Sequence, residues 1–310
     1  MEKIVENNSA QLLKPNKKVR IERTGKMLTL AAVSLTIGIA FAILFLVSSK
    51  GLSTFYINKG SVVEFFTGLK WNPGAVNELG KPIIGALPFI FGSFAVTFLA
   101  AAISAPVAIG AAVFMTEISP NFGKKILQPV IELLVGIPSV VYGFIGLTVV
   151  VPFIRDHISG SGFGIAAGAV VLSVMILPTI TSLSADAIRG VSRQLREASL
   201  ALGATRWQTI FRVVLKTARP GLLTAVIFGM ARAFGEALAV QMVIGNSSVI
   251  PTSLFEPGAT LTSILTMGMG YSVMGQAENN ALWSLALVLL IMSLIFIIAV
   301  RMIGKGRKEA

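Results

Sequence analysis

Six apolar runs, each long enough to cross a lipid bilayer, constrain this sequence more than any other feature. A helix needs about 20 apolar residues to span roughly 30 Å of hydrocarbon. Of the 310 residues, 54% are hydrophobic and 13% are charged, whereas soluble domains carry about 25% charged residues. The sequence therefore predicts an all-α, polytopic membrane protein with six transmembrane helices, at residues 27–47, 87–115, 133–151, 163–183, 222–244 and 281–302. Pro106, Pro138 and Pro178 predict bends in the second, third and fourth helices.

The distribution of lysine and arginine predicts how these helices are oriented. Most of the 26 Lys and Arg residues lie before the first run, between the second and third, between the fourth and fifth, or after the sixth. By the positive-inside rule, these segments and both termini are expected in the cytoplasm. We expect the first run to be a retained span, because it is longer than the apolar core of a signal peptide. The predicted organisation is a basic tail (1–26), the first span (27–47), an external segment with a short interfacial helix (48–86), a core of five spans (87–302) and a cytoplasmic tail (303–310).

Several kinds of chemistry are disfavoured by residue types that are scarce or absent. The chain has no cysteine and one histidine, His157, so we predict neither a metal site nor a cofactor. No phosphate-binding loop of the form GxxxxGK[ST] occurs, so ATP would have to be bound by another polypeptide. An integral membrane enzyme would need a catalytic constellation that few intramembrane carboxylates could supply. The net charge of +12 is typical of cytoplasmic loops beside membrane lipid and does not indicate nucleic-acid binding.

The connection between the fourth and fifth runs, residues 184–221, is basic and strongly patterned. Ser192 is a predicted N-cap for a helix whose apolar positions lie at i, i+3 and i+7, namely Leu195, Ala198 and Leu202. Gly203 predicts the end of that helix. Thr205 and Gln208 fit the capping box of a second helix that ends before Pro220. The pattern predicts two helices joined by a tight turn. They form either a protrusion for a soluble partner or an amphipathic loop that caps the bundle.

The same loop resembles the Glu-Ala-Ala loop of ABC importer permeases. The resemblance rests on Glu197-Ala198-Ser199, on Gly203 six residues after the glutamate, and on Val213-Val214-Leu215. Ser199 replaces the second alanine of the pattern, and Lys216 stands where the family usually has proline. The resemblance implies a type I ABC importer permease fold and a loop that docks into a separate ATPase subunit. The residues that it assigns to that loop are Glu197, Ala198, Ser199, Leu202, Gly203, Ala204 and Thr205.

Further stretches resemble the C-type permease subunits of phosphate-specific ABC importers. These stretches are 71–73 with 85–89, 129–143, and 230–246, and the likeness covers residues 65–246. It implies a subunit of an ATP-driven phosphate importer that forms half of the translocation pathway. The implied partners are an A-type phosphate permease subunit in a heterodimer, two copies of an ATPase subunit, and an external phosphate-binding protein.

Arg232 and Glu236 are the candidate substrate-pathway residues, inside the fifth run. An arginine near the middle of a span needs a compensating partner, and a helix would place Glu236 on the same face, four residues on, within reach of an ion pair. The pair either locks the fifth span to its neighbours or lies on the pathway, where the guanidinium would meet an oxyanion. Resemblance favours the pathway role. The residues alone leave open an importer of sulfate, molybdate or phosphonate, and a stand-alone channel or carrier.

Overall fold

The computed structural model describes residues 17–78, 80–158 and 160–305. The chain divides into two units, Met1–Ser49 and Lys50–Ala310, and each is described by itself. Within the described residues, six helical stretches are long and apolar enough to cross a membrane, which confirms the predicted fold class. They are Ile21–Tyr56, Leu87–Ile118, Ser139–His157, Ile165–Arg189, Arg206–Phe234 and Ala277–Ala299.

Helix α2 (Lys17–Tyr56) carries the first span. It continues beyond residue 47, the predicted end of the first span, and no proline interrupts residues 17–56. Its apolar side chains are exposed from residue 21 to residue 46, as those of Leu28, Phe41 and Phe45 illustrate. Such a helix is suited to a lipid environment.

A short helix and a hairpin follow, and they form one end of the second unit. Helix α3 (Val62–Thr67) is N-capped by Ser61 and matches the short helix expected in the external segment. Strands β1 (Trp71–Val76) and β2 (Pro82–Ile84) pair antiparallel, with Trp71 opposite Ile84. They pack on a cluster that includes Phe65 and Phe89. The all-α expectation did not include this hairpin, whose strands are too short to show a clear alternating pattern.

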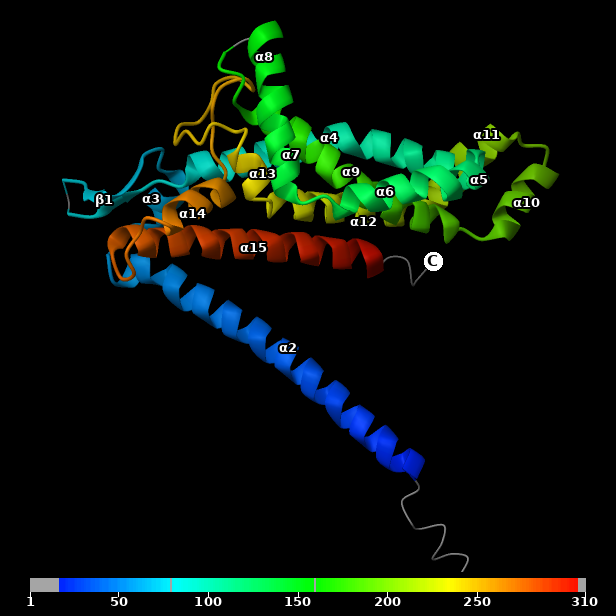
Figure 1. Cartoon of the computed structure of the whole chain (residues 1–310), viewed down its shortest axis with the longest axis horizontal. Coiled ribbons are helices and arrows are strands. Elements are labelled where there is room, and N and C mark those ends of the chain that lie inside the picture. Colours follow the sequence, from blue (N-terminus) through cyan, green and yellow to red (C-terminus); the bar gives the residue numbers. More distant parts are fainter. Residues whose placement is uncertain (1–16, 79, 159, 306–310) are drawn as a thin grey trace, which may run out of the picture. The chain divides into compact units, whose positions relative to one another are not determined.

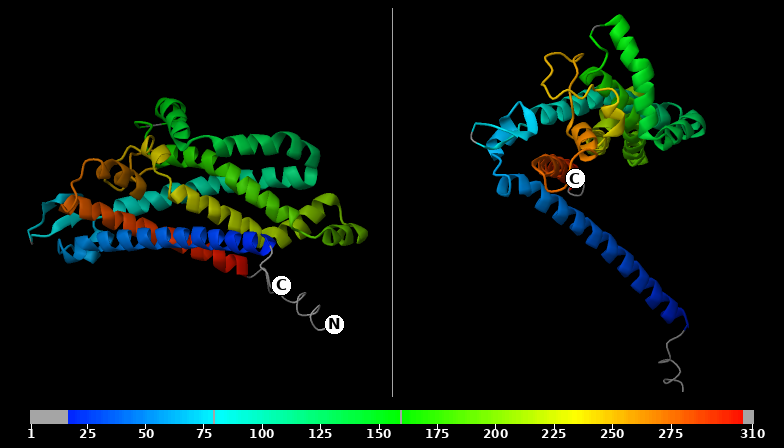
Figure 2. Two further views of the ribbon diagram at one scale, coloured as in Figure 1. Left: turned by 60° about the horizontal axis from the view of Figure 1, so that its bottom comes forward. Right: turned by 60° about the vertical axis from the view of Figure 1, so that its left-hand side comes forward.

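Four long helices form the centre of the second unit (Figure 2). They are α4 (Leu87–Val113), α9 (Ile165–Arg189), α12 (Leu215–Phe234) and α15 (Ala277–Lys305). Helix α9 packs against α4 and α12, and α12 packs against α4 and α15. Gly221 and Gly229 allow the close contact of α12 with α9, since a Cβ there would meet Ala187 or Ile180 at 2.6 and 2.5 Å.

The three predicted bends have different outcomes. Pro106 and Pro178 lie inside the continuous helices α4 and α9. The chain breaks at Pro138, between α6 (Gln128–Gly136) and α7 (Ser139–Ile145). The third span therefore begins at Ser139, not near residue 133, and continues through the π-helical turn η3 (Gly146–Val150) and α8 (Val151–His157). Ile137 precedes the proline and is extended, as steric contact with a proline ring favours.

The segment 184–221 is also organised differently from the prediction. Helix α9 continues to Arg189, so the segment begins inside it. The predicted first helix is α10 (Arg193–Ala201). The second is the start of the fifth span, because α11 (Arg206–Gln208), the π-helical turn η4 (Thr209–Val214) and α12 are continuous. Pro220 lies within α12 and does not end it, as is tolerated in membrane helices.

The fifth span ends earlier than the predicted residue 244. Helix α12 ends at Phe234, and Gly235 is its C-cap. A four-residue helix, α13 (Leu238–Gln241), and a loop lead to α14 (Leu261–Met269), a helix that is not among the predicted ones. The second span ends with the π-helical turn η1 (Phe114–Ile118), and α5 (Pro120–Phe122) and the π-helical turn η2 (Gly123–Leu127) follow it. In Figure 1 the β1–β2 hairpin and the α10–α11 turn lie at opposite ends of the long helices.

Candidate functional site

Local capping fixes the shape of the α10–α11 turn. The Ser192 hydroxyl accepts a hydrogen bond from the Gln194 N–H at 3.2 Å. Gly203 has φ of +81°, a left-handed conformation that glycine adopts without steric cost. Thr205 and Gln208 form the predicted capping box, with bonds of 3.2 and 2.9 Å between each side chain and the other's backbone N–H. The caps and the turn predicted from the sequence are therefore present.

The outward face of this turn is apolar and exposed. Leu195, Ala198 and Leu202 are all exposed, and Leu202 has 89% of its surface accessible. Trp207 is 60% exposed and packs against Phe211, with ring centroids 4.4 Å apart and ring planes tilted by 46°. The predicted apolar stripe therefore does not cap the bundle. Large exposed apolar side chains that cluster on a polar protrusion are typical of a surface for a protein partner.

Other residues of the predicted docking loop support the turn or lie at its surface. Glu197 is exposed and pairs with Arg193 at 2.7 Å. Ser199 faces inward, and its hydroxyl lies 2.9 Å from the Thr209 hydroxyl. The Ala204 N–H donates to the Ser199 carbonyl at 3.2 Å, which closes the turn after Gly203.

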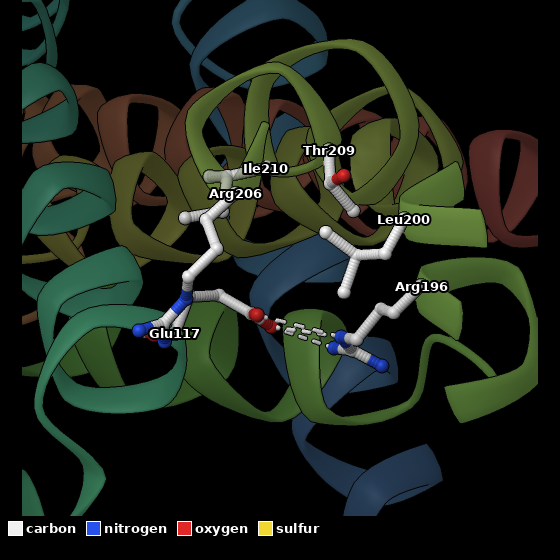
Figure 3. A pocket seen from close by; sticks show the side chains of 6 residues that line it. All are labelled: Glu117, Arg196, Leu200, Arg206, Thr209 and Ile210. Carbon is white, nitrogen blue, oxygen red and sulfur yellow. Dashed lines mark hydrogen bonds and ion pairs between the residues drawn. The ribbon is translucent and has the colours of Figure 1, made fainter. Parts of the chain in front are cut away.

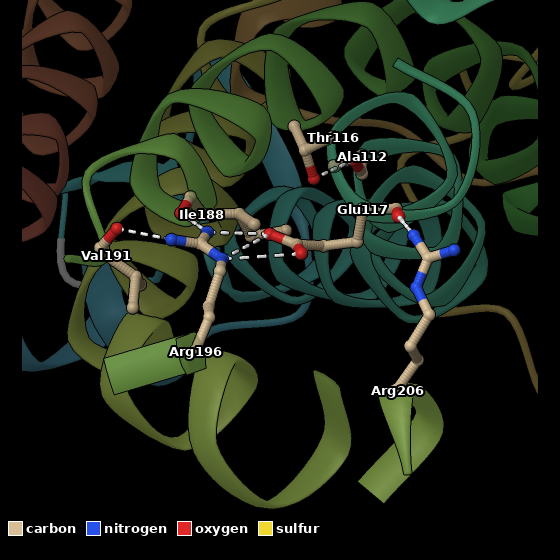
Figure 4. A network of polar contacts seen from close by, with 7 residues as sticks. All are labelled: Ala112, Thr116, Glu117, Ile188, Val191, Arg196 and Arg206. Atoms are coloured by element: carbon tan, nitrogen blue, oxygen red, sulfur yellow. Dashed lines mark hydrogen bonds and ion pairs between the residues drawn. The ribbon is translucent and has the colours of Figure 1, made fainter. Parts of the chain in front are cut away.

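The inward face of α10 is anchored by a salt bridge between Arg196 and Glu117 (Figure 4). The Arg196 Nη2 donates to the Glu117 Oε1 at 2.6 Å, and the side chains of the two residues are only 22% and 13% exposed. The same guanidinium donates to the Ile188 and Val191 carbonyls at the end of α9, at 2.9 and 2.5 Å. Ile188 is in the last turn of α9 and Val191 lies two residues past its end. Cations are favoured beside carbonyls at a helix C-terminus.

Arg206 connects the other side of the turn to the same residue. Its Nη2 donates to the Glu117 backbone carbonyl at 3.1 Å. Glu117, Arg196, Arg206, Leu200, Thr209 and Ile210 line a small pocket of about 170 Å³ (Figure 3). Glu117 and Arg206 were not among the predicted site residues. Glu117 is 79 positions from Arg196, and no single-sequence pattern indicates a contact over that separation.

An apolar cluster supports this end of the molecule. It joins the end of α4, the end of α9 and the η4–α12 helix, through Ala112, Val113, Ala185, Ile188, Val191, Ile210, Val214, Ala218 and Leu222. The α10–α11 turn thus projects from a packed base, with an exposed apolar outer face and a polar inner face.

Arg232 lies in the fifth span, two residues before the end of α12. Its Nη1 donates to the Thr179 hydroxyl in α9 at 2.6 Å. The side chain is half-buried and lines a cavity of about 480 Å³ with Thr179, Phe228, Ala231 and Ile297. Within the described part of the chain, no carboxylate pairs with Arg232.

The expected ion pair between Arg232 and Glu236 is wrong. Helix α12 ends at Phe234, so four-residue helical spacing no longer places the two side chains on one face. The Glu236 Oε1 instead accepts the Ala239 N–H at 3.2 Å, at the start of α13. The Glu236 carbonyl accepts the Thr262 hydroxyl at 2.7 Å. Glu236 therefore stabilises the break in the chain that follows Arg232.

Several buried hydroxyl side chains lie near that break in the chain. The Thr260 and Ser263 side chains form a capping box at the start of α14. The Ser93 hydroxyl in α4 accepts the Leu261 N–H at 2.9 Å, and Ser93 and Thr262 are almost fully buried. The hydroxyls of Ser93, Thr260 and Ser263 thus accept hydrogen bonds from the backbone N–H groups at the start of α14, where water is excluded.

The chain is similar to membrane subunits of ABC transporters. Residues 104–309 match the model of the binding-protein-dependent transport system inner membrane component family. A probable ABC transporter permease protein, YqgH of Bacillus subtilis, is 58% identical over 93% of this chain and 92% of its own length. The phosphate transport system permease protein PstC of Xylella fastidiosa is 33% identical over 89% of this chain and 90% of its own length.

Solved structures support the fold. The inward-facing MetNI methionine ABC transporter matches with a TM-score of 0.53 at 22% identity, over 72% of this chain and 94% of the matched chain. An amino acid ABC transporter solved with histidines matches with a TM-score of 0.50 at 18% identity, over 72% and 92%. Six membrane-spanning helices, this shared fold and the family match lead to one assignment. The chain belongs to the family of binding-protein-dependent transport system inner membrane components, the permease subunits of ABC importers.

Proposed function

We propose that this chain is a permease subunit of an ATP-driven importer of inorganic phosphate and forms half of the translocation pathway. The observation that carries the proposal is the state of Arg232, a half-buried cation in the fifth span whose hydrogen-bond partner is a neutral hydroxyl. A charge in a membrane span is costly unless it is compensated. An oxyanion in the pathway would supply that compensation during transport.

The chemistry of the guanidinium fits phosphate. Arginine presents planar donors that bind two phosphate oxygens at once, and these charge-assisted bonds are stronger than neutral ones. The relatives named as phosphate transport system permeases, such as the PstC protein of Xylella fastidiosa, support phosphate as the anion. In this proposal Glu236 shapes the chain break beside Arg232 and keeps the pathway open there.

The α10–α11 turn is the proposed docking site for a separate ATPase. Its residues Glu197, Ala198, Leu202 and Ala204 lie on a protrusion whose apolar side chains are largely exposed in the isolated chain. Family membership supports partners that hydrolyse ATP and deliver substrate. The proposed complex contains an A-type phosphate permease in a heterodimer with this chain, two ATPase subunits and an external phosphate-binding protein.

Uptake of labelled phosphate tests the substrate. Cells that lack this chain should take up phosphate at a reduced rate under phosphate limitation, and the intact gene should restore the rate. A tenfold excess of unlabelled phosphate should abolish the restored uptake, whereas the same excess of sulfate or molybdate should leave it unchanged. Competition by sulfate or molybdate instead would assign the importer to that anion and would contradict phosphate.

Crosslinking tests the docking site. The chain contains no cysteine, so Ala201→Cys introduces a unique thiol on the exposed end of α10. This thiol should crosslink to the ATPase subunit in the assembled complex. Val76→Cys on the β1–β2 hairpin is the matched control, since it is exposed at the opposite end of the long helices (Figure 1) and should give no such product. Crosslinking at position 76 and not at 201 would contradict the proposed docking.

A further inference from the structure

We propose that Glu117 is a positioning residue that joins the α10–α11 turn to the second span, so that movement of the turn is transmitted to α4. This inference rests on the proposed docking of an ATPase at the turn. It concerns a different contact, on the inner face of α10, which neither the family match nor the relatives assign.

The geometry makes Glu117 a junction of three helical elements. Glu117 lies in η1, which continues α4 without a break. Its carboxylate accepts from both the Nε and the Nη2 of Arg196, on α10. That guanidinium also donates to the Ile188 and Val191 carbonyls at the end of α9. One charged pair thus connects the second span, the fourth span and α10 (Figure 4).

Glu117 also holds both arms of the turn. Its side chain accepts from Arg196, which precedes Gly203, and its backbone carbonyl accepts from Arg206, which follows it. The turn itself has no side-chain packing at Gly203, where a Cβ would meet nothing within 4 Å. Because two arginines from the two arms meet one residue, the arms and η1 move together.

The pair is well suited to transmit a displacement. Both side chains are mostly buried, and a charge-assisted bidentate pair resists separation more than a neutral hydrogen bond does. The apolar cluster beneath the turn connects α4 and α9 to the η4–α12 helix. It includes no residue of α10. Helix α10 contacts η4, where the Ser199 hydroxyl lies 2.9 Å from that of Thr209. Among the described residues, the salt bridge to Glu117 is its direct polar link to the second span.

The test is the ratio of phosphate imported to ATP hydrolysed by the complete complex with its binding protein in proteoliposomes. Glu117→Gln keeps the side-chain shape and removes the charge. We expect this ratio to fall about tenfold, with hydrolysis per assembled complex changed less than about twofold. Glu117→Asp keeps the charge and should restore part of the ratio. A merely structural role would lower import and hydrolysis together and leave the ratio unchanged.

Arg189→Gln is the matched control, because it neutralises an exposed arginine at the end of α9 whose partner, Asp186, is also exposed. It should keep the wild-type ratio. Crosslinking through Ala201→Cys in the Glu117→Gln background separates the two proposals. A retained crosslink with a wild-type ratio would overturn the role of Glu117 and leave docking intact. Loss of the crosslink in the otherwise native chain would overturn the docking proposal itself.

Discussion

Two arginines, one at the α10–α11 end and one in the fifth span, have opposite environments. Arg196 is surrounded by a carboxylate and two backbone carbonyls, so its donors are largely used within the chain. Arg232 donates to one hydroxyl, of Thr179. The same side chain therefore stabilises structure where a carboxylate compensates its charge, and where none does we propose that it binds an anion. Arg196→Ala and Arg232→Gln test this difference, and Gly203→Ala and Thr205→Ala test the local structure of the turn that Arg196 anchors.

Arg196→Ala should have the largest effect. It would leave Glu117 mostly buried without its partner, which costs about 3 kcal/mol. Arg193→Ala removes the exposed pair with Glu197 on the same helix and should cost about 0.5 kcal/mol at most. Thermal unfolding of the purified complex measures both. Equal effects of the two variants would mean that the burial of the Glu117 pair does not matter for stability.

Arg232→Gln should lower phosphate import by about tenfold to a hundredfold, the range expected for loss of a charge-assisted bond. The complex should still assemble and melt at the wild-type temperature, because within this chain the change affects one hydrogen bond, from Arg232 to the Thr179 hydroxyl. Arg232→Lys keeps the charge and should be intermediate. Normal import by the glutamine variant would break the contrast between the two arginines.

Gly203→Ala should destabilise the turn by about 1 kcal/mol, because φ of +81° is strained for any residue with a Cβ. No atom lies within 4 Å of the added Cβ, so the loss is conformational and not steric. Gly136→Ala is a control at an equally open position with ordinary backbone geometry. The two variants should differ in the melting temperature of the complex.

Thr205→Ala should cost slightly less, about 0.5 to 1 kcal/mol, through loss of the capping box. Thr205→Ser retains the hydroxyl and should restore most of the stability. Combining Thr205→Ala with Arg196→Ala shows whether the local cap and the salt bridge hold the turn independently. Additive losses would indicate that they do, and losses that are not additive would indicate one coupled unit.

The features that the sequence predicts correctly are local. Ser192, Gly203 and the Thr205–Gln208 box act within a few residues of themselves, so their chemistry can be read from the order of residues. The spans follow from apolar length alone. The predicted Arg232–Glu236 pair failed because it assumed an uninterrupted helix.

What was missed depends on tertiary structure. The break after Phe234 has one local signal, the C-cap Gly235. Buried hydroxyls from α4 and α14 stabilise the broken ends, and the sequence does not indicate those contacts. Pro220 was expected to stop a helix, yet the packed surroundings of α12 tolerate it. The Arg196–Glu117 contact joins residues 79 positions apart. A single sequence records none of these neighbours.

The continuous helix from Arg206 to Phe234 is 29 residues long, which at 1.5 Å per residue extends about 43 Å. The hydrocarbon layer occupies only about 30 Å of that length, so roughly two helical turns stand clear of the lipid tails. Arg206, Arg212, Lys216 and Arg219 lie toward that overhanging end. Of these, Arg206 and Arg212 lie within the first two turns of the helix. Cations at that end would pair with lipid phosphates and would set how far the helix is immersed.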